Sequence, residues 1–375
     1  MIKTEIIKGQ RSWVLENKNI KLCLTEMGGH MAPVVFMRDS DNPIEPFYIN
    51  PWADENLNLE NEPDVLTPLR GDFFCLPFGG DNSWYDETHP AHGETSCSPW
   101  TLVPRDKENS ITLQIVTASR KGSVLKKIEL KEGENILYIS HTIKGFTGPA
   151  SLGHHAIFPG GTKKYISTSP IKFGYTNRYD TENYNGGEYY SLASLGKFQN
   201  LEKVPTIWLE NEYTDCSVFP SREGFVDILQ VFNQPKEDFA WSAVTVPEEG
   251  YLWFSLKDSS ILPSTVLWTE NRGRHQNPWN GRNVCIGVED VCSSFADGLS
   301  VSAEENFLNK EGIKTCHQIK ENSELSVKYI QGVVRIPDGF ERVKTILKKD
   351  EGIEISSYTG EKVFTKVDTN FLFTD

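Results

Sequence analysis

The sequence lacks the features that define several common classes of protein. Its seven cysteines are odd in number, scattered along 375 residues and never spaced as Cys-x-x-Cys. We therefore expect neither a disulfide framework nor a structural zinc site. No stretch approaches the roughly 18 apolar residues that a membrane-spanning helix needs, and residues 1–5 do not begin a signal peptide. These absences predict a soluble, cytoplasmic chain, or a periplasmic one if a signal peptide has been removed.

Positive charge is also scarce. The chain carries 52 acidic residues against 38 lysines and arginines, a formal net charge of -14. This balance disfavours a nucleic-acid partner and provides no basic patch for an anionic membrane. We expect a small, neutral molecule as the partner, and a monomer or homodimer.

Helical periodicity is rare, whereas alternation of apolar and polar residues is frequent. Strands are predicted at residues 20–24, 111–116, 124–130, 136–143, 252–256, 264–268 and 324–329. The 29 glycines and 20 prolines supply the turns between them. This pattern predicts an all-β fold built from large antiparallel sheets, in which the segments between residues 111 and 143 pair consecutively.

No low-complexity linker or fixed-period repeat divides the chain. We expect one β-sandwich domain over residues 1–332, with a short helix near residues 303–309. Residues 333–375 are predicted to form an extension packed on the same domain. A helix at residues 339–348 and a hairpin at residues 353–373 would build it.

A loop rich in glycine, histidine, acids and aromatic residues spans residues 77–100 and is typical of a ligand site. Two apolar runs end in polar pairs, His154-His155 and Glu289-Asp290. Adjacent residues of a strand face opposite ways, so only one member of each pair can enter a groove. A histidine and a carboxylate at two strand ends could form an acid–base pair.

Several segments resemble those around the sugar site of the aldose 1-epimerases (galactose mutarotases) and the hexose-6-phosphate 1-epimerases. They are residues 69–79 (LRGDFFCLPFG), 90–93 (PAHG), 99–100 (PW), 155–158 (HAIF), 266–269 (VLWT) and 285–289 (CIGVE). Their order and spacing agree over roughly residues 10 to 330. The resemblance implies a galactose-mutarotase-like β-supersandwich, with a sugar bound in a groove across one large sheet.

The resemblance also implies a set of roles. Glu289 would be the general base and His155 the general acid, while His92 would bind the sugar near its ring oxygen. Arg70 and Trp268 would contact the substrate. Anomer interconversion moves one proton from the C1 hydroxyl and one to the ring oxygen, so it requires no metal and no redox cofactor.

Each role has an alternative. His155 could be a core histidine bonded to a backbone carbonyl, with His154 the functional one. Glu289 could cap a turn or pair with Arg282, and Asp290 could then take its place. His92 could brace its loop or join His89 and Glu94 in a metal site, although the intervening proline suits a turn better. Arg70 could pair with an acid. The two cations of the 271–275 cluster (NRGRH) could reach an anionic sugar, but a solvated loop is the expectation. The aromatics Trp84, Tyr85, Trp100 and Trp279 are expected mostly to lie in the core.

The chain departs from the hexose-6-phosphate epimerases directly after His92-Gly93. Their following arginine is replaced by Glu94-Thr95-Ser96. Converging arginines usually hold a phosphate, so this departure favours an unphosphorylated sugar.

Two other function classes stay open. A glycoside hydrolase or polysaccharide lyase on a related sandwich would use a second carboxylate, which in a hydrolase lies roughly 5–9.5 Å from the first. Asp81, Glu94 and Asp290 are available for that role. A non-catalytic sugar-binding protein would keep the aromatics and lose the acid–base pair. The discriminating feature is whether His155 and Glu289 converge on one pocket with no further carboxylate opposite.

Overall fold

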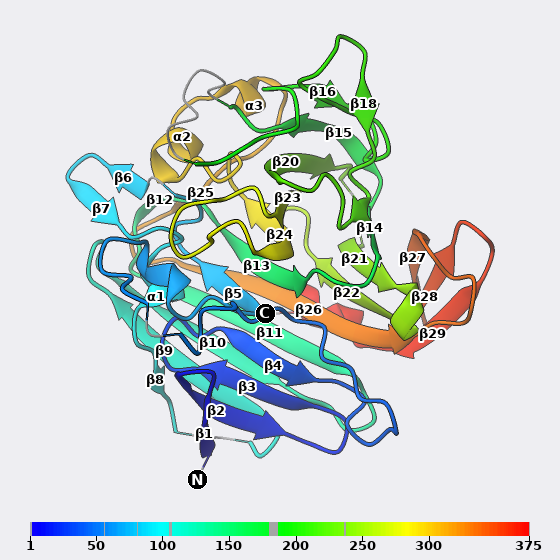
Figure 1. Ribbon diagram of the computed structural model, residues 1–375. Helices are drawn as coiled ribbons and strands as arrows, with labels where there is room; N and C mark the ends of the chain where they lie inside the picture. Colours follow the sequence, from blue (N-terminus) through cyan, green and yellow to red (C-terminus); the bar gives the residue numbers. More distant parts are fainter. Residues whose placement is uncertain are drawn as a thin grey trace.

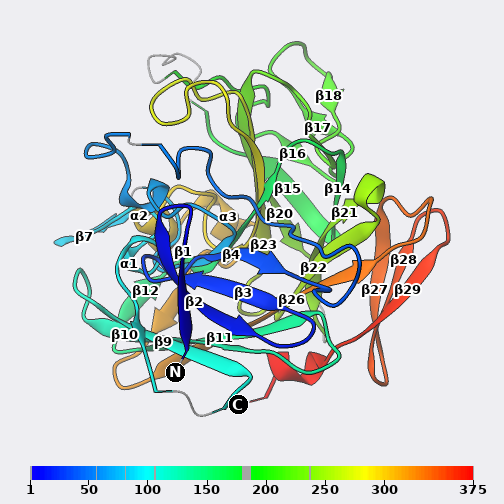
Figure 2. The same cartoon turned by 60° about the horizontal axis from the view of Figure 1, so that its bottom comes forward.

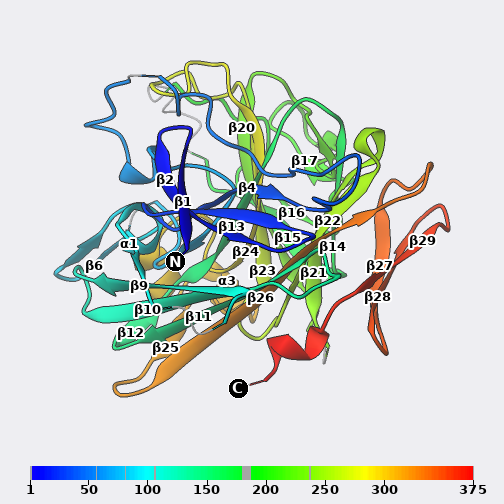
Figure 3. The same cartoon turned by 90° about the horizontal axis from the view of Figure 1, so that it is seen from below.

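A computed structural model describes residues 2–55, 57–80, 82–104, 107–179, 187–235 and 238–374. These residues form two large antiparallel sheets of 11 and nine strands, which stack face to face (Figures 1 and 3). The all-β prediction is confirmed. None of the described helices has the length and apolarity to span a membrane.

The larger sheet carries the central strands of the molecule. Its order is β1 (Lys3–Ile7), β2 (Gln10–Glu16), β3 (Lys21–Thr25), β4 (Met31–Val35), β5 (Asp72–Cys75), β13 (Leu152–Pro159), β24 (Val284–Cys292), β23 (Ser264–Asn271), β20 (Phe225–Asn233), β15 (Ile171–Thr176) and β16 (Lys197–Phe198). Strands β5, β13, β23 and β24 are buried along nearly their whole length. Both faces of this part of the sheet are therefore covered, the inner face by the second sheet and the outer face by loops.

The smaller sheet contains the consecutive strands expected between residues 111 and 143. Its order is β19 (Val218–Phe219), β14 (Lys164–Thr168), β21 (Ala240–Val246), β22 (Tyr251–Lys257), β26 (Glu324–Arg335), β11 (Ile136–Lys144), β10 (Gly122–Glu129), β9 (Ser110–Thr117) and β8 (Thr101–Leu102). β9, β10 and β11 pair in sequence, as predicted. Alternation gives this sheet two apolar faces: Leu137 and Ile139 enter the core between the sheets, while Ile136 and Tyr138 enter a second core.

Short two-stranded ribbons and short helices complete the domain. The ribbons are β6 (Asn82–Trp84) with β7 (Glu87–His89), β12 (Gly148–Ala150) with β25 (His317–Ile319), and β17 (Val204–Pro205) with β18 (Tyr213–Thr214). The helices are α1 (Glu94–Cys97), α2 (Leu299–Ala303) and α3 (Phe307–Lys310), with 3-10 turns at Asp64–Leu66, Pro247–Glu249 and Thr369–Leu372. The helix expected at residues 303–309 is two helices, because Glu304 is extended and the Asn306 side chain caps α3 anew.

The second core lies beneath a three-stranded sheet, β27 (Val343–Lys349), β28 (Gly352–Ser357) and β29 (Lys362–Lys366), which packs on the nine-stranded sheet (Figures 1 and 2). The predicted hairpin is present as β28 and β29. The helix predicted at residues 339–348 is wrong, because its second half is β27. A bulge between Val343 and Thr345 turns both Val343 and Ile346 inward, so a strand imitates helical spacing.

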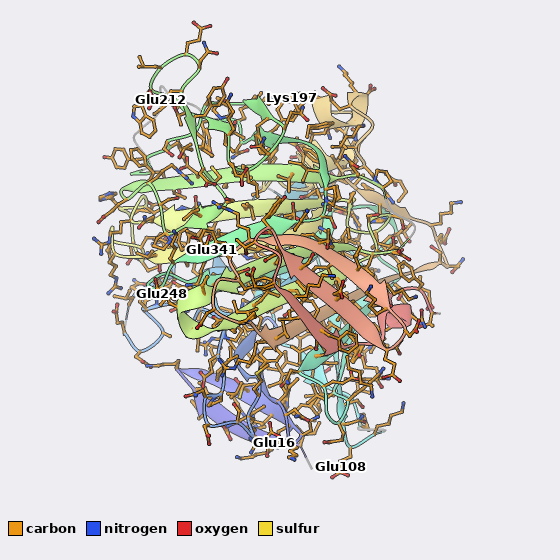
Figure 4. All side chains as sticks on the ribbon, turned by 90° about the vertical axis from the view of Figure 1, so that its right-hand side faces the viewer. Glu16, Glu108, Lys197, Glu212, Glu248 and Glu341 are labelled. Carbon is orange, nitrogen blue, oxygen red and sulfur yellow. The ribbon has the colours of Figure 1, made fainter. Side chains whose placement is uncertain are left out.

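Figure 4 shows this side of the molecule with the three-stranded sheet in front and Glu341, which precedes β27, beside it. Lys197 and Glu212 lie at one end of the view, and Glu16 and Glu108 lie at the other. The outer face of the larger sheet, where the candidate site lies, is separate from this appended sheet, since the appended sheet shares its core with the smaller sheet.

Candidate functional site

His155 and Glu289 lie side by side at the centre of the larger sheet. They are direct partners in the antiparallel pairing of β13 and β24, so their side chains leave the sheet on the same face. His155 Nε2 is 3.2 Å from Glu289 Oε1. On the neighbouring strands Phe73 and Val266 hold the adjoining positions of the same row. The two predicted catalytic residues are thus brought together; we call them the acid–base pair.

Their sequence neighbours face the opposite way, into the core between the sheets. His154 Nδ1 is 2.7 Å from Asp72 Oδ2, and the His154 ring stacks on Tyr329 at 4.0 Å. Asp290 accepts hydrogen bonds from Lys257 at 2.5 Å and from Tyr329 at 2.7 Å. Both alternatives for the catalytic positions are therefore committed to structural contacts on the inner face.

The acid–base pair lines a cavity of about 100 Å³, which we call the inner chamber. Its lining is Val65, Leu66, Leu69, Phe73, His92, His155, Ile228, Val266, Trp268, Arg274, Trp279, Glu289 and Ala296. A second cavity of about 400 Å³, the outer chamber, shares part of this wall. Its lining is Glu62, Pro63, Val65, Leu66, Gly80, Ala91, His92, Asn177, Glu188, Tyr190, Val226, Ile228, Arg274, Gln276, Trp279, Ala296 and Asp297. Together they form a polar cleft with an apolar, aromatic inner end.

A tight loop presents His92 to both chambers. The His92 backbone has a φ of 59°, and its N–H donates to the Gly79 carbonyl at 2.7 Å. Gly93 follows with a φ of 75°, and a Cβ there would lie 1.9 Å from the Leu76 carbonyl oxygen, so only glycine fits. The His92 ring stands edge-on to His155 with centroids 5.0 Å apart. The structure thus places His92 where it could contact a ligand of the pair.

Trp268 and Trp279 form the aromatic wall of the inner chamber. Their rings meet edge to face at 5.7 Å, and Trp268 approaches His155 at 5.9 Å. Trp268 Nε1 is buried and has no hydrogen-bond partner among the described residues. Trp279, expected to be core, lines both chambers. By contrast Trp100 belongs to the main core and Tyr85 is exposed.

Arg70 is the predicted site residue that the structure does not bring to the cleft. It is fully buried, and its guanidinium donates to the carbonyls of Pro68, Ile7 and Lys8 at 3.1, 2.8 and 2.9 Å. Burial lowers the pKa of Arg70 to about 10. Carbonyl groups at the end of β1 therefore bind this side chain. Arg70 makes a structural contact in place of the expected sugar contact or ion pair.

Arg274 is the site residue that the sequence reasoning missed, because the 271–275 cluster was expected to be a solvated loop. Its Nε lies 2.8 Å from Glu188 Oε1, and its guanidinium carbon lies 5.4 Å from the Trp268 ring and 5.1 Å from the Trp279 ring. Glu270 Oε1 fixes the loop by accepting from the Arg274 backbone N–H at 3.2 Å. The cluster of two cations directly after a β-strand was the available signal.

The sequence matches no protein-family model and no curated protein. Solved structures do resemble the chain. A galactose mutarotase-like protein from Clostridium acetobutylicum has a TM-score of 0.59 at 13% identity, covering 90% of this chain and 99% of that one. A galactose mutarotase related enzyme from Lactobacillus acidophilus has a TM-score of 0.54 at 13% identity, with coverages of 87% and 98%. The galactose 1-epimerase of L. acidophilus NCFM has a TM-score of 0.52 at 11% identity, with coverages of 90% and 100%.

The chain has the galactose-mutarotase-like fold. At these identities the likeness establishes the architecture, and it agrees with the β-supersandwich that the sequence resemblance implied. The chemistry of this chain depends on the residues of its own cleft.

Burial shifts both members of the acid–base pair toward their uncharged forms. It raises the pKa of Glu289 well above its usual range, an effect that the positive charge of Arg274 partly opposes. It lowers the pKa of His155 well below its usual range, and nearby His92 adds to this lowering. Burial also lowers the pKa of His92 to about 4. Both shifts favour an uncharged pair, with the proton on Glu289 and none added to His155.

The other carboxylates considered for the site lie elsewhere. Glu94 accepts from the backbone N–H groups of Ala118 and Ser119, and Asp290 is in the core. Asp81 lies outside the described residues. Among the described residues that line the inner chamber, Glu289 is the one carboxylate. Glu62, Glu188 and Asp297 line the adjoining outer chamber.

The suggested metal ligands also separate. His89 pairs with Glu87 at 3.2 Å, while His92 Nδ1 lies 3.4 Å from Cys75 Sγ. Glu94 binds backbone N–H groups, as described above. No group of three or more metal-ligating side chains gathers within the described part of the chain.

Proposed function

We propose that this protein is an aldose 1-epimerase-like isomerase that interconverts the α and β anomers of an unphosphorylated sugar. The observation that carries the proposal is the contact of 3.2 Å between His155 Nε2 and Glu289 Oε1 at the inner end of a polar cleft. The two oxygens that exchange protons in this reaction share one carbon atom. An acid and a base that serve them must therefore lie side by side, as these two groups do.

The reaction proceeds through the open-chain sugar. The Glu289 carboxylate takes the proton of the C1 hydroxyl, the bond between C1 and the ring oxygen breaks, and protonated His155 gives its proton to that oxygen. Rotation about the C1–C2 bond presents the other face of the aldehyde. In ring closure His155 recovers the proton from the attacking hydroxyl, and Glu289 returns its proton to the carbonyl oxygen.

The pair is suited to this exchange because it holds one proton in total. The proton can rest on either partner without changing the net charge of the site, and burial favours the arrangement in which both partners are uncharged. Arg274 favours the arrangement with ionised Glu289, in which the pair is ready to react. His92 also lines the inner chamber, and its ring would bind the ring oxygen or a neighbouring hydroxyl.

An unphosphorylated substrate is favoured by the charges of the cleft. Arg70 is engaged with backbone carbonyls, and Arg274 already pairs with Glu188. Three carboxylates, those of Glu62, Glu188 and Asp297, line the outer chamber. A phosphate is usually held by several converging arginines, and Arg274 is the one arginine among the described residues that line the two chambers.

The test measures anomer exchange of glucose and galactose by polarimetry of freshly dissolved α-anomers. His155→Gln and Glu289→Gln should each lower turnover by roughly 10²–10⁴-fold, because size is retained and the titrating group is lost. The double variant should be little worse than the worse single variant, since the two groups act as a unit. His317→Gln is a matched control, because His317 is a buried strand histidine outside the cleft.

Two outcomes would contradict the proposal. If wild type accelerates exchange and both glutamine variants keep the wild-type rate, the acid–base pair is not the site. If wild type leaves free and phosphorylated aldoses unchanged across a broad panel, the function is sugar binding without catalysis or a different reaction on sugars.

A further inference from the structure

The outer chamber is larger than the proposed reaction requires. Its volume is about 400 Å³, against about 100 Å³ for the inner chamber that holds the acid–base pair. A sugar that reacts at C1 must place that end at the pair, so the opposite end of the ring and any group attached to it extend into the outer chamber. His92, Arg274 and Trp279 line both cavities, so the two chambers adjoin.

The wall of the outer chamber is rich in hydrogen-bond acceptors. Asn177 Oδ1 and Gln276 Oε1 are buried and have no partner among the described residues. Asp297 and Glu62 add carboxylate oxygens. Unpaired buried acceptors are rare in folded proteins and favour a ligand that donates hydrogen bonds. Sugar hydroxyls are such donors.

Part of the donor set of this wall is already engaged with Glu188. Arg274 Nε lies 2.8 Å from Glu188 Oε1, and Gln276 Nε2 donates to the same carboxylate oxygen at 3.1 Å. The Tyr190 hydroxyl donates to the other oxygen of Glu188. Arg274 is the one cation that lines either chamber within the described residues. An anionic group in the outer chamber would meet the three carboxylates of Glu62, Glu188 and Asp297.

An aromatic face runs along the junction of the chambers. Trp279 is almost fully buried, packs edge to face against Trp52 at 4.9 Å and Trp268 at 5.7 Å, and lines both cavities. Tyr190 stacks on Tyr179 at 4.2 Å and contributes to the outer wall. Rings fixed in this way present an apolar surface that the C–H face of a pyranose can cover.

We propose that the outer chamber is a binding site for a second sugar unit, and that the substrate is a neutral disaccharide or longer oligosaccharide whose reducing end enters the inner chamber. This inference rests on the proposed function for the chemistry at C1. The site itself is argued from the volume, the unpaired acceptors and the aromatic face, which do not depend on catalysis.

The kinetic test compares lactose, maltose and cellobiose with galactose and glucose, using magnetisation-transfer NMR to measure the exchange of reducing-end anomers. Wild-type kcat/KM for the best disaccharide should exceed that for the best monosaccharide by at least about tenfold. Asn177→Ala and Asp297→Asn should each lower the disaccharide value by roughly two- to tenfold more than the monosaccharide value, the usual worth of one hydrogen bond. Asp350→Asn, in the exposed turn between β27 and β28, is the matched control.

A binding test separates this inference from the proposed function. Saturation-transfer NMR with the Glu289→Gln variant measures the affinity for the same five sugars without turnover. Preference for a disaccharide that weakens with Asn177→Ala supports the second subsite, even if wild type interconverts no anomers and the proposed function fails. Equal affinity and equal kcat/KM for both sugar sizes, or equal losses in the outer-chamber variants, would overturn the second subsite and leave the anomer chemistry standing.

Discussion

Glu289→Gln should stabilise the fold while it removes activity. Glu289 is only 2% exposed, and burial raises the pKa of its carboxyl well above the ordinary value of 4.5. In the unfolded chain this carboxyl ionises near its ordinary pKa, whereas in the folded chain it stays protonated to higher pH. Folding must then take up a proton, and this opposes folding more strongly as the pH rises above about 4.5.

The sign of the effect follows from the raised pKa. The stability that Glu289 contributes is fully present below the unfolded pKa and is lost as the pH rises through the folded pKa. A glutamine does not titrate, so the variant has no such loss of stability at this position. The stability of Glu289→Gln minus that of wild type should therefore be small near pH 4.5 and grow toward pH 8. Stabilising changes at functional positions typically gain about 0.5–2 kcal/mol, which corresponds to roughly 1–4 °C in Tm for a large domain.

His155→Gln should show the mirror image. Burial lowers the pKa of His155 well below the ordinary value of 6.5, so below that pH the unfolded chain binds a proton that the folded chain refuses. The advantage of His155→Gln over wild type should be small above pH 7 and grow as the pH falls toward 5. This opposite pH dependence is a signature that loss of packing alone does not produce.

Thermal unfolding followed by circular dichroism between pH 4.5 and 8 provides the assay. Glu223→Gln is the matched control, because Glu223 is exposed and paired with Arg272 at the surface, away from the cleft. If the Glu289→Gln difference is independent of pH or grows toward acid, the carboxyl is not held protonated by burial. The account of the acid–base pair would then be wrong.

Three further predictions concern residues around the site. Arg274→Gln removes the positive charge that lowers the pKa of Glu289. The alkaline limb of the kcat/KM profile should therefore move to higher pH, and a limb that stays in place would contradict this. Lys257→Met leaves Asp290 buried without its cation and should lower the free energy of unfolding by about 3–5 kcal/mol in urea titrations, and adding Asp290→Asn should restore part of it. Gly93→Ala should lower Tm more than Gly133→Ala, because both have a φ of 75° but only Gly93 meets a backbone oxygen; equal losses would show that the contact relaxes.

The sequence predicted the structure best in strands with one face buried, because burial there alternates from residue to residue. The alternation in residues 111–143 predicted three paired strands because each second residue enters the core. The same alternation predicted that His154 and His155 face opposite ways, and the resemblance of residues 155–158 selected His155 as the one in the groove. It failed at residues 343–348, since a bulge changes the period within the strand and makes Val343 and Ile346 share a face.

Arg70 and Arg274 show why the rest of the site could not be predicted. The environment of Arg70 is set by the carbonyls of Ile7 and Lys8, more than 60 residues earlier, which no local pattern relates to it. The position of Arg274 depends on Trp279 and Glu188, which come from different parts of the chain. Long, flexible cationic side chains take their direction from tertiary partners, so a motif locates the backbone and leaves the role of the side chain undetermined.

The two faces of β24 carry acidic residues in different environments, Asp290 on the inner face and Glu289 on the outer face. On the inner face Asp290 is fully satisfied, with Lys257, Tyr329 and three hydroxyl groups around it. On the outer face Glu289 Oε1 is buried and accepts no hydrogen bond from the described residues. A rigid polar network one residue away can hold β24 in place while Glu289 keeps an unsatisfied oxygen for a ligand. Satisfying Glu289 as fully as Asp290 would lower its pKa and remove the property on which the proposed reaction depends.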